Sequence, residues 1–296
     1  EQGMKDACQA HVKRNPYHRD LLSRLIESEE SEAVAEVLTW DSDVLYEMMI
    51  YRDESYQGIF LKLISKQWFS LANKFLNVVG PRTGISQPNL IMDNPQKVIY
   101  TLLNQAGPLS TEQNDLICAI VGNNPYLLTG CTVDYYESHE DPPLHFTLRK
   151  GFDETFEKML VLCYRLGPQD QNVALATNSK GQTLLSLAIS LRRVSLIKAL
   201  REYCQRTYVS LGSSFSSYVL ESIQTSQTTI VQEIVAFRSD CYSPGVDMRC
   251  IEAAIEKGIL KILEIIWPHF ETTEYDLTQL FAYQLSLPNL KGERGL

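Results

Sequence analysis

The residues best suited to chemistry in this sequence lie in an irregular stretch at 123–141. Cys131 is followed there by Asp134, His139 and Glu140. A thiol nucleophile needs a base such as histidine, so these residue types suit a cysteine protease, a transglutaminase or a deamidase. However, the separation of eight positions from Cys131 to His139 says nothing about geometry, and no family signature surrounds the cysteine. We therefore predict that the protein is not an enzyme, and we keep a cysteine-dependent enzyme using 123–141 as the alternative.

The sequence shows no pattern typical of a metal or cofactor site. Cys241 and Cys250 are nine residues apart and have no histidine at zinc-finger spacing. The zinc-protease motif HExxH, the phosphate-binding P-loop and the dinucleotide motif GxGxxG do not occur. We expect no metal ion and no cofactor.

The element that organises the chain is a helical hairpin over 178–204. A polar turn ends at Gly181, and Thr183 can cap the helix that follows. Apolar residues then recur at helical spacing on both sides of a break at Arg192 and Arg193; they are Leu184, Leu185, Ala188 and Ile189 before it, and Val194, Leu196, Ile197 and Leu200 after it. The pattern predicts two short helices joined by a tight turn.

Similar hairpins recur along the chain. The stretch 59–76 aligns without a gap when Leu63 is set on Ala188, which places Gln67 on the break at Arg192. Equivalent small or apolar residues anchor six units: Leu25, Leu63, Thr147, Ala188, Ser222 and Ala254. Their steps are 38, 84 (two units), 41, 34 and 32 residues, and two helices in each such period indicate a stacked solenoid. We predict an all-α solenoid of six or seven hairpins, closed by a capping helix at 275–285.

Several of these units resemble the ankyrin repeat. Pro142-Pro143-Leu144-His145 followed by Gly151 is similar to the start and break of that family's unit, as are Asn178, Gly181 and Thr183 over its turn, and Ala253-Ala254 with Gly258 in its middle. The resemblance implies that the His145 imidazole bonds the backbone of a neighbouring turn. It covers about 140–268, whereas only helix spacing survives over 20–122, where TPR-like pairs are the alternative. Degenerate repeats with irregular loops also resemble those of effectors that intracellular bacteria inject into host cells.

Three segments follow from this organisation. We predict degenerate helical repeats over 4–122, an irregular loop or joint over 123–140, and ankyrin-like repeats with the capping helix over 141–296. Residues 1–3 are interpreted as an expression remnant before a native Met4, and the polar residues after Met4 do not resemble a secretory signal. We expect a cytoplasmic protein, or one secreted into the cytosol of a host cell.

Composition narrows the classes of partner. The net charge of −9 argues against a general nucleic-acid binder, and no run approaches 18 apolar residues, so we expect no membrane insertion. The seven cysteines are odd in number and widely spaced, which disfavours a disulfide framework. The partner we predict is another protein, either a bacterial effector or a host protein, which this chain binds and then inhibits or positions. A scaffold for several proteins is a further alternative.

The predicted binding surface follows from the geometry of an ankyrin-like stack, in which turns and first helices line a groove. The positions we expect to be exposed there are His139, Lys180, Gln182, Ser186, Phe215, Tyr218, Arg249 and Glu252. Tyr135, Tyr136, Phe215 and Tyr218 are of a type enriched at the energetic centres of interfaces. Two charge clusters could steer a partner: an acidic one at 27–36, and a basic one comprising Arg192, Arg193, Lys198, Arg201 and Arg206.

Overall fold

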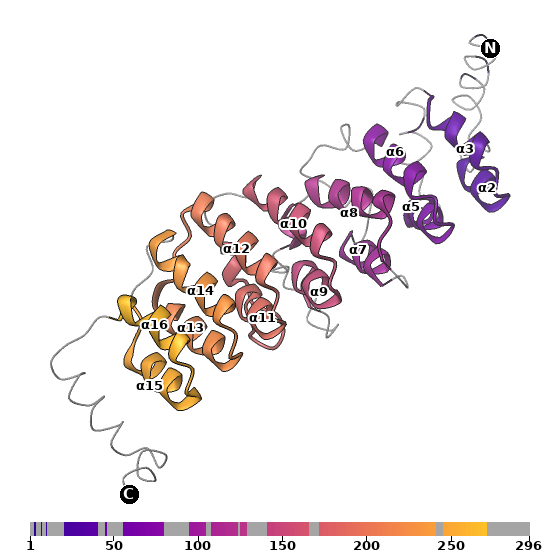
Figure 1. The fold of residues 1–296 in the computed structure, drawn as a ribbon. Coiled ribbons are helices and arrows are strands. Elements are labelled where there is room, and N and C mark those ends of the chain that lie inside the picture. The colour runs from indigo at the N-terminus through magenta and orange to yellow at the C-terminus, as the bar shows by residue number, and fades with distance from the viewer. Residues whose placement is uncertain are drawn as a thin grey trace, which may run out of the picture. The chain divides into compact units, whose positions relative to one another are not determined.

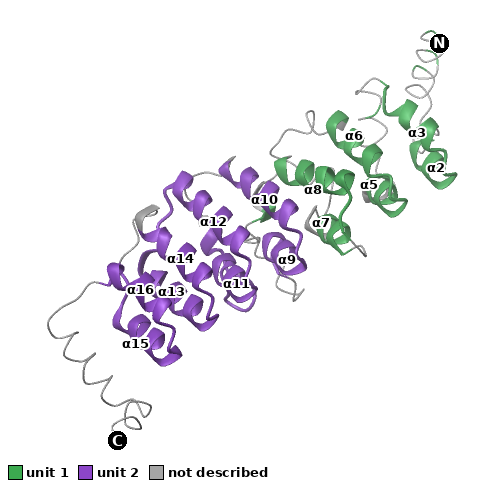
Figure 2. Ribbon diagram, viewed as in Figure 1, with its two compact units in different colours: residues 1–133 green, residues 134–296 purple. Residues whose placement is uncertain are grey.

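The computed structural model describes residues 21–40, 45, 56–79, 95–104, 108–123, 125–128, 141–165, 172–240 and 245–270, with isolated positions at 3, 7 and 10. The predicted all-α class is confirmed for these residues, which contain helices and no strand. The described residues also form two isolated β-bridges, which join Thr177 to Thr183 and Val246 to Phe270. The chain divides into two compact units, residues 1–133 and residues 134–296 (Figure 2). This division falls within the predicted joint at 123–140, and the predicted segment boundaries themselves stay a prediction.

Unit 1 is built from helix pairs in chain order. The described helices are α2 (Leu21–Glu27), α3 (Ser31–Val37), α5 (Tyr56–Ser65), α6 (Phe69–Val79), α7 (Pro95–Leu103) and α8 (Thr111–Asn123), followed by the 3-10 turn η3 (Pro125–Leu128). α2 packs on α3 and α5, α6 packs on α5 and α8, and α7 packs on α8. The apolar stripe of each helix is buried between neighbours, with Leu22, Ile26, Leu63 and Ile117 fully enclosed.

The described residues of unit 2 form four helix pairs whose members make two rows (Figure 1). The first helices are α9 (Pro143–Lys150), α11 (Leu184–Ser190), α13 (Phe215–Gln224) and α15 (Met248–Lys257). The second helices are α10 (Asp153–Leu162), α12 (Val194–Thr207), α14 (Thr228–Asp240) and α16 (Leu260–Ile266). Each first helix packs on the next first helix and each second helix on the next second helix. Short 3-10 turns lie between the pairs at Cys163–Arg165, Asn172–Leu175 and Gly212–Ser214, and a further one, Trp267–His269, follows α16.

One turn geometry closes six hairpins across both units. Four residues after each predicted anchor the backbone is left-handed, with φ of 61° at Glu29, 60° at Gln67, 79° at Gly151, 58° at Arg192, 59° at Ser226 and 65° at Gly258. In four of them the carbonyl of the anchor also accepts a hydrogen bond from the residue five positions on, at 3.0 Å from Glu30 to Leu25, 2.9 Å from Trp68 to Leu63, 3.0 Å from Phe152 to Thr147 and 3.0 Å from Arg193 to Ala188. The predicted breaks are therefore confirmed as a repeated backbone turn. This turn also satisfies carbonyls that a helix end would otherwise leave unpaired.

Local sequence explains where the helices of unit 2 begin and end. Pro143 occupies the first turn of α9, where its missing N–H costs no hydrogen bond. The Thr183 side chain accepts a hydrogen bond from the Ser186 N–H at 3.1 Å, so the predicted cap of α11 is confirmed. Asp247 caps α15 in the same way through the Cys250 N–H at 3.3 Å. The starts of α9, α11 and α15 are thus fixed by short-range chemistry.

Candidate binding surface

His145 has a structural role in unit 2. Its side chain is buried on α9, and its Nε2 lies 3.0 Å from the carbonyl oxygen of Gln182 in the turn before α11. Desolvation by burial lowers the pKa of this imidazole to about 4, so it is neutral at physiological pH and Nε2–H donates. The predicted bond between this imidazole and a neighbouring turn is confirmed, and it ties the first hairpin of unit 2 to the second.

The turn before α11 is held by hydrogen bonds to the Asn178 side chain and presents outer side chains to solvent. The Oδ1 atom of Asn178 accepts hydrogen bonds from the backbone N–H groups of Lys180 at 3.0 Å and Gln182 at 2.9 Å. Gly181 adopts a φ of 73° within this turn. Lys180 is exposed and Gln182 is half-buried. The exposure of Lys180 agrees with the prediction, whereas Gln182 is less exposed than predicted, and their role in binding stays a prediction.

Ser186 and Glu221 extend this surface from α11 to α13. The Ser186 hydroxyl donates a hydrogen bond of 2.7 Å to Oε2 of Glu221. Ser186 is half-buried, whereas Glu221 is exposed. Glu221 is a surface residue that sequence reasoning missed. The sequence feature that could have identified Glu221 is its position on the first helix of the hairpin, one residue before the Ser222 anchor.

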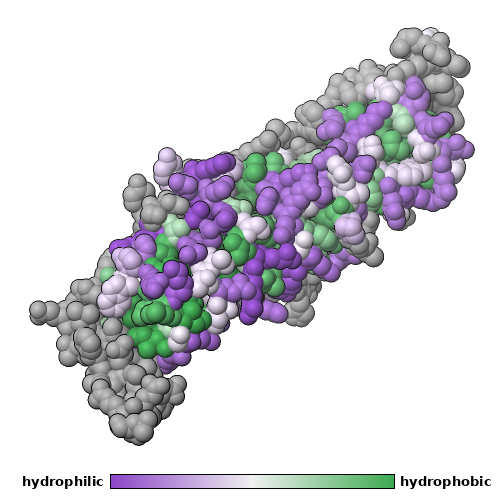
Figure 3. Space-filling model, in the orientation of Figure 1, coloured by the Kyte–Doolittle hydropathy of each residue, from purple (hydrophilic) through white to green (hydrophobic). Residues whose placement is uncertain are grey.

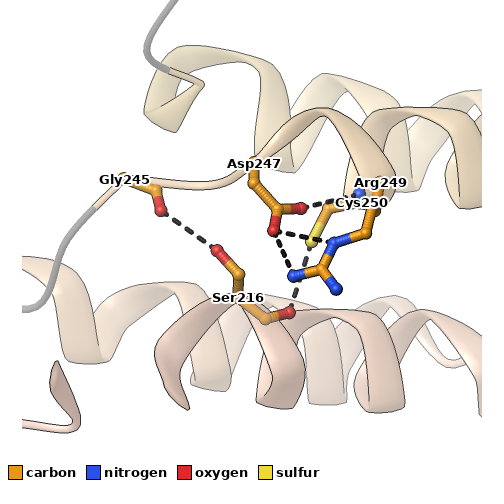
Figure 4. Close-up of polar contacts among 5 residues, drawn as sticks. All are labelled: Ser216, Gly245, Asp247, Arg249 and Cys250. Atoms are coloured by element: carbon orange, nitrogen blue, oxygen red, sulfur yellow. Dashed lines mark hydrogen bonds and ion pairs between the residues drawn. The ribbon is translucent and has the colours of Figure 1, made fainter. Parts of the chain in front are cut away.

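The start of α15 completes the surface (Figure 4). Arg249 is exposed and makes an ion pair with Asp247, at 2.6 Å between Nη2 and Oδ2. On the inner side, the Cys250 thiol donates to the carbonyl of Ser216 at 3.3 Å, and the Ser216 hydroxyl donates to the carbonyl of Gly245 at 3.3 Å. These contacts hold the start of α15 on α13, so the position of Arg249 is set by both hairpins.

We name this surface the first-helix edge. It consists of Lys180, Gln182, Ser186, Glu221, Arg249 and the half-buried Glu252. This surface is polar and carries both positively charged side chains and negatively charged carboxylates. Such a surface suits a partner that carries complementary charges and hydrogen-bonding groups.

The expectation that Phe215 and Tyr218 are exposed was wrong. They are 0% and 4% exposed, respectively. The 3-10 turn Gly212–Ser214 runs directly into α13, and Phe215, Tyr218, Val219 and Ser222 then share its buried stripe. Burial raises the pKa of Tyr218, and a hydrogen bond with the Thr183 side chain partly offsets the rise. These two aromatic residues belong to the core of unit 2 and not to the first-helix edge.

His139 lies outside the described residues. The same holds for Cys131 with Asp134 and Glu140, for Tyr135 and Tyr136, and for the capping helix at 275–285. The predictions that rest on these positions remain predictions.

Two of the described cysteines, Cys163 and Cys250, have thiols that burial keeps protonated. Burial raises the pKa of the Cys163 thiol to about 12, and burial followed by the nearby Asp247 carboxylate raises that of Cys250 to about 12. A thiol with so high a pKa carries almost no thiolate at neutral pH, and the thiolate is the nucleophile. Among the described residues, no group of three or more histidine, cysteine or acidic side chains could hold a metal ion.

Several charged residues of the two predicted clusters form ion pairs between neighbouring hairpins. In the basic cluster, Arg193 pairs with Asp153 at 3.3 Å, and Arg201 pairs with Glu233 at 3.0 Å. In the acidic cluster, Glu27 pairs with Lys62 and Glu29 with Lys66. Each pair joins one hairpin to the next in sequence. These side chains therefore contribute to hairpin packing, and fewer charges are left to steer a partner.

Exposed apolar side chains occur on elements that sequence reasoning left out of the surface. Tyr208 at the end of α12 is 87% exposed, and Val161 on α10 is 58% exposed. Leu260 and Trp267 are exposed at the two ends of α16.

Within the described part of the chain, every helix is too short or too polar to cross a membrane. Searches of protein-family models, of curated proteins and of solved structures found no match to the chain.

Proposed function

We propose that the chain is a non-catalytic protein-binding module, whose unit 2 is a solenoid of ankyrin-like repeats. The observation that carries this proposal is the row of first helices, which brings turns from separate hairpins side by side. Lys180 and Arg249 are 69 positions apart in sequence, yet each lies at the start of a first helix in this row. A surface assembled from several repeats can grip an extended partner.

The mechanism we propose is occlusion. The first-helix edge binds another protein and thereby blocks or positions it, and its charged side chains favour a partner of complementary charge. We infer that this partner is a bacterial effector or a host protein, met in the cytosol of a host cell. General appearance, size and acidity support the inference, since these features resemble those of MesI, a small helical effector that binds and restrains a partner effector.

The test is affinity capture with the full chain from lysates of the source organism and of a host cell, followed by mass spectrometry. We expect one dominant stoichiometric partner. Reversing two exposed charges, in the variant Lys180→Glu with Arg249→Glu, should weaken its binding at least about tenfold, which corresponds to about 1.4 kcal/mol. Lys158→Glu on the second-helix row is the matched charge reversal and should leave the affinity unchanged.

Three results would count against the proposal. Retained affinity in the double variant, with native circular dichroism, would remove the first-helix edge as the site. Capture of many substoichiometric proteins would favour a scaffold. A Cys131→Ala variant that abolishes the biological effect while the protein still binds its partner would favour the enzyme.

A further inference from the structure

The last described hairpin, α15 with α16, exposes apolar positions that the earlier hairpins bury. One such position directly follows each anchor, and another lies nine residues after it. In the earlier hairpins the residues at these positions are at most 1% exposed; they are Ile26, Ile64, Leu148, Ile189 and Ile223 at the first, and Val34, Ala72, Phe156, Ile197 and Val231 at the second. The equivalent residues of the last hairpin, Ile255 and Leu263, are only half-buried.

Two further apolar side chains extend this surface along α16. Leu260 is 69% exposed, and Trp267 is 43% exposed although its ring packs on Phe270 with the centroids 5.9 Å apart. Leu260, Leu263 and Trp267 recur at positions i, i+3 and i+7, so they share one side of the helix. We name Ile255, Leu260, Leu263 and Trp267 the end face; apolar surface gathers over α15 and α16 in Figure 3. A patch of this kind marks an interaction site.

Equivalent positions within unit 2 show that the end face points to where a next hairpin would lie. Trp267 comes thirteen residues after its anchor, and Arg201 occupies this position in the α11–α12 hairpin. Arg201 pairs there with Glu233 of the following hairpin, at 3.0 Å. The contact that the end face lacks is therefore of the kind that joins one hairpin of this chain to the next.

Charged side chains border the end face. Lys261 and Glu264 are exposed on α16 and pair with each other at 3.0 Å between Nζ and Oε2. Glu264 comes ten residues after its anchor. Lys198 occupies this position in the α11–α12 hairpin and pairs with Glu233 of the following hairpin at 3.4 Å. Glu264 is therefore placed to meet a cation on the molecule that covers the end face.

A second copy of the chain supplies both an apolar surface and the matching charges. When two end faces meet about a two-fold axis perpendicular to α16, the two α16 helices run antiparallel. The long Lys261 side chain of each copy then comes within reach of Glu264 of the other copy. The segment at 275–285, where the sequence predicts a capping helix, carries Asp276 but no lysine or arginine. It offers no cation to Glu264, so charge complementarity favours the second copy.

We propose that two copies of the chain associate through their end faces, so that each covers the other's Ile255, Leu260, Leu263 and Trp267. This contact takes the place of the capping helix that the sequence predicts over this end. It does not depend on the proposed partner of the first-helix edge, because no residue of that edge belongs to the end face.

Sedimentation equilibrium of the full chain measures this association. The mass should rise from one copy to two as the protein concentration increases. Leu260→Asp should weaken the dimer at least about tenfold, because it buries an unpaired charge in the contact. Leu260 is the first residue of α16, where an aspartate suits a helix start, so the variant should keep its fold. Val161→Asp on α10, also an exposed apolar residue, is the matched control and should leave the dimer unchanged.

Charge reversal at the rim identifies the two-fold contact itself. Lys261→Glu and Glu264→Lys each place like charges across the axis, and each should weaken self-association at least about tenfold. Mixed in equal amounts, the two variants should form a one-to-one heterodimer, because each supplies the charge that the other lacks. An ion pair confined to one chain does not produce this rescue.

A mass of one copy at every concentration would overturn the proposal. Oxidative footprinting of Trp267 in that monomer would then identify the occupant, since slow oxidation would assign the end face to the chain's own segment. A dimer that persists unchanged in Leu260→Asp would place the contact elsewhere. Rim variants that fail to pair when mixed would refute the two-fold arrangement, and growth beyond two copies would replace it by a head-to-tail contact.

Discussion

Replacing His145 by glutamine should remove a specific part of the pH dependence of stability. Glutamine can still donate to the Gln182 carbonyl, which lies 3.0 Å from Nε2 in the wild type, but it does not titrate. In the folded protein the pKa of His145 is lowered from 6.5 to about 4 by burial. The unfolded chain therefore takes up a proton at this residue at a higher pH than the folded chain does.

The sign and size of the effect follow from this difference. The full stability is present above pH 6.5, and it is lost as the pH falls from there toward about 4, because the unfolded state gains the proton first. At pH 5 the loss amounts to about 2 kcal/mol, since one pKa unit corresponds to about 1.36 kcal/mol. The wild type should therefore lose about 2 kcal/mol more than His145→Gln between pH 7.5 and pH 5.

Urea unfolding followed by circular dichroism at pH 7.5, 6 and 5 measures this difference, because the other titrating groups contribute equally to both proteins. His269→Gln is the control at a surface position, where burial also lowers the histidine pKa but the side chain is only half-buried. It should show a smaller pH-dependent difference. Parallel loss of stability in the wild type and His145→Gln would refute the assignment of His145 as a buried neutral residue.

Three further predictions address the turns and the thiols. Thr183→Ala should lower the free energy of unfolding by about 1 kcal/mol because it removes the cap of α11, and Thr183→Ser should retain most of it; equal losses in chemical denaturation would contradict this. Arg192→Gly should raise stability by a few tenths to about 1 kcal/mol, because glycine adopts a φ of 58° without strain, and a lowered midpoint would show that the Arg192 side chain contributes packing. Cys163 and Cys250 should resist alkylation at pH 8 in the native protein and react in urea; rapid native labelling of either, mapped by mass spectrometry, would contradict their burial.

Local features of the fold could be predicted from the sequence because short-range chemistry determines them. The anchor spacing located the left-handed turns even where Gln67 or Arg192 replaces the expected glycine. The Thr183 cap and the first-turn Pro143 are likewise set by residues within one helical turn of each other. The His145 contact came from a family resemblance, and the structure supplied its distance and its partner.

The properties of the candidate surface were harder to predict because they depend on which hairpin covers each side chain. Phe215 and Tyr218 are near a loop in sequence, yet packing buries both. Arg193 and Arg201 looked like part of a basic cluster, but their carboxylate partners, Asp153 and Glu233, are 40 and 32 residues away. Sequence spacing does not report contacts between hairpins of this kind. The exposed Tyr208 was missed for the same reason, since apolar type alone does not distinguish a covered side chain from an uncovered one.

The row-on-row packing of unit 2 has a consequence for how mutations combine. Within the described part of unit 2, each hairpin contacts the hairpin next to it in sequence. Substitutions in α9 and α15 therefore share no contacting element, and their effects on the free energy of unfolding should add. Substitutions in neighbouring helices, such as Ser186 on α11 and Glu221 on α13, should instead show a measurable coupling energy in a double-mutant cycle. The stability of unit 2 thus behaves as a chain of nearest-neighbour terms, so its variants can be combined hairpin by hairpin.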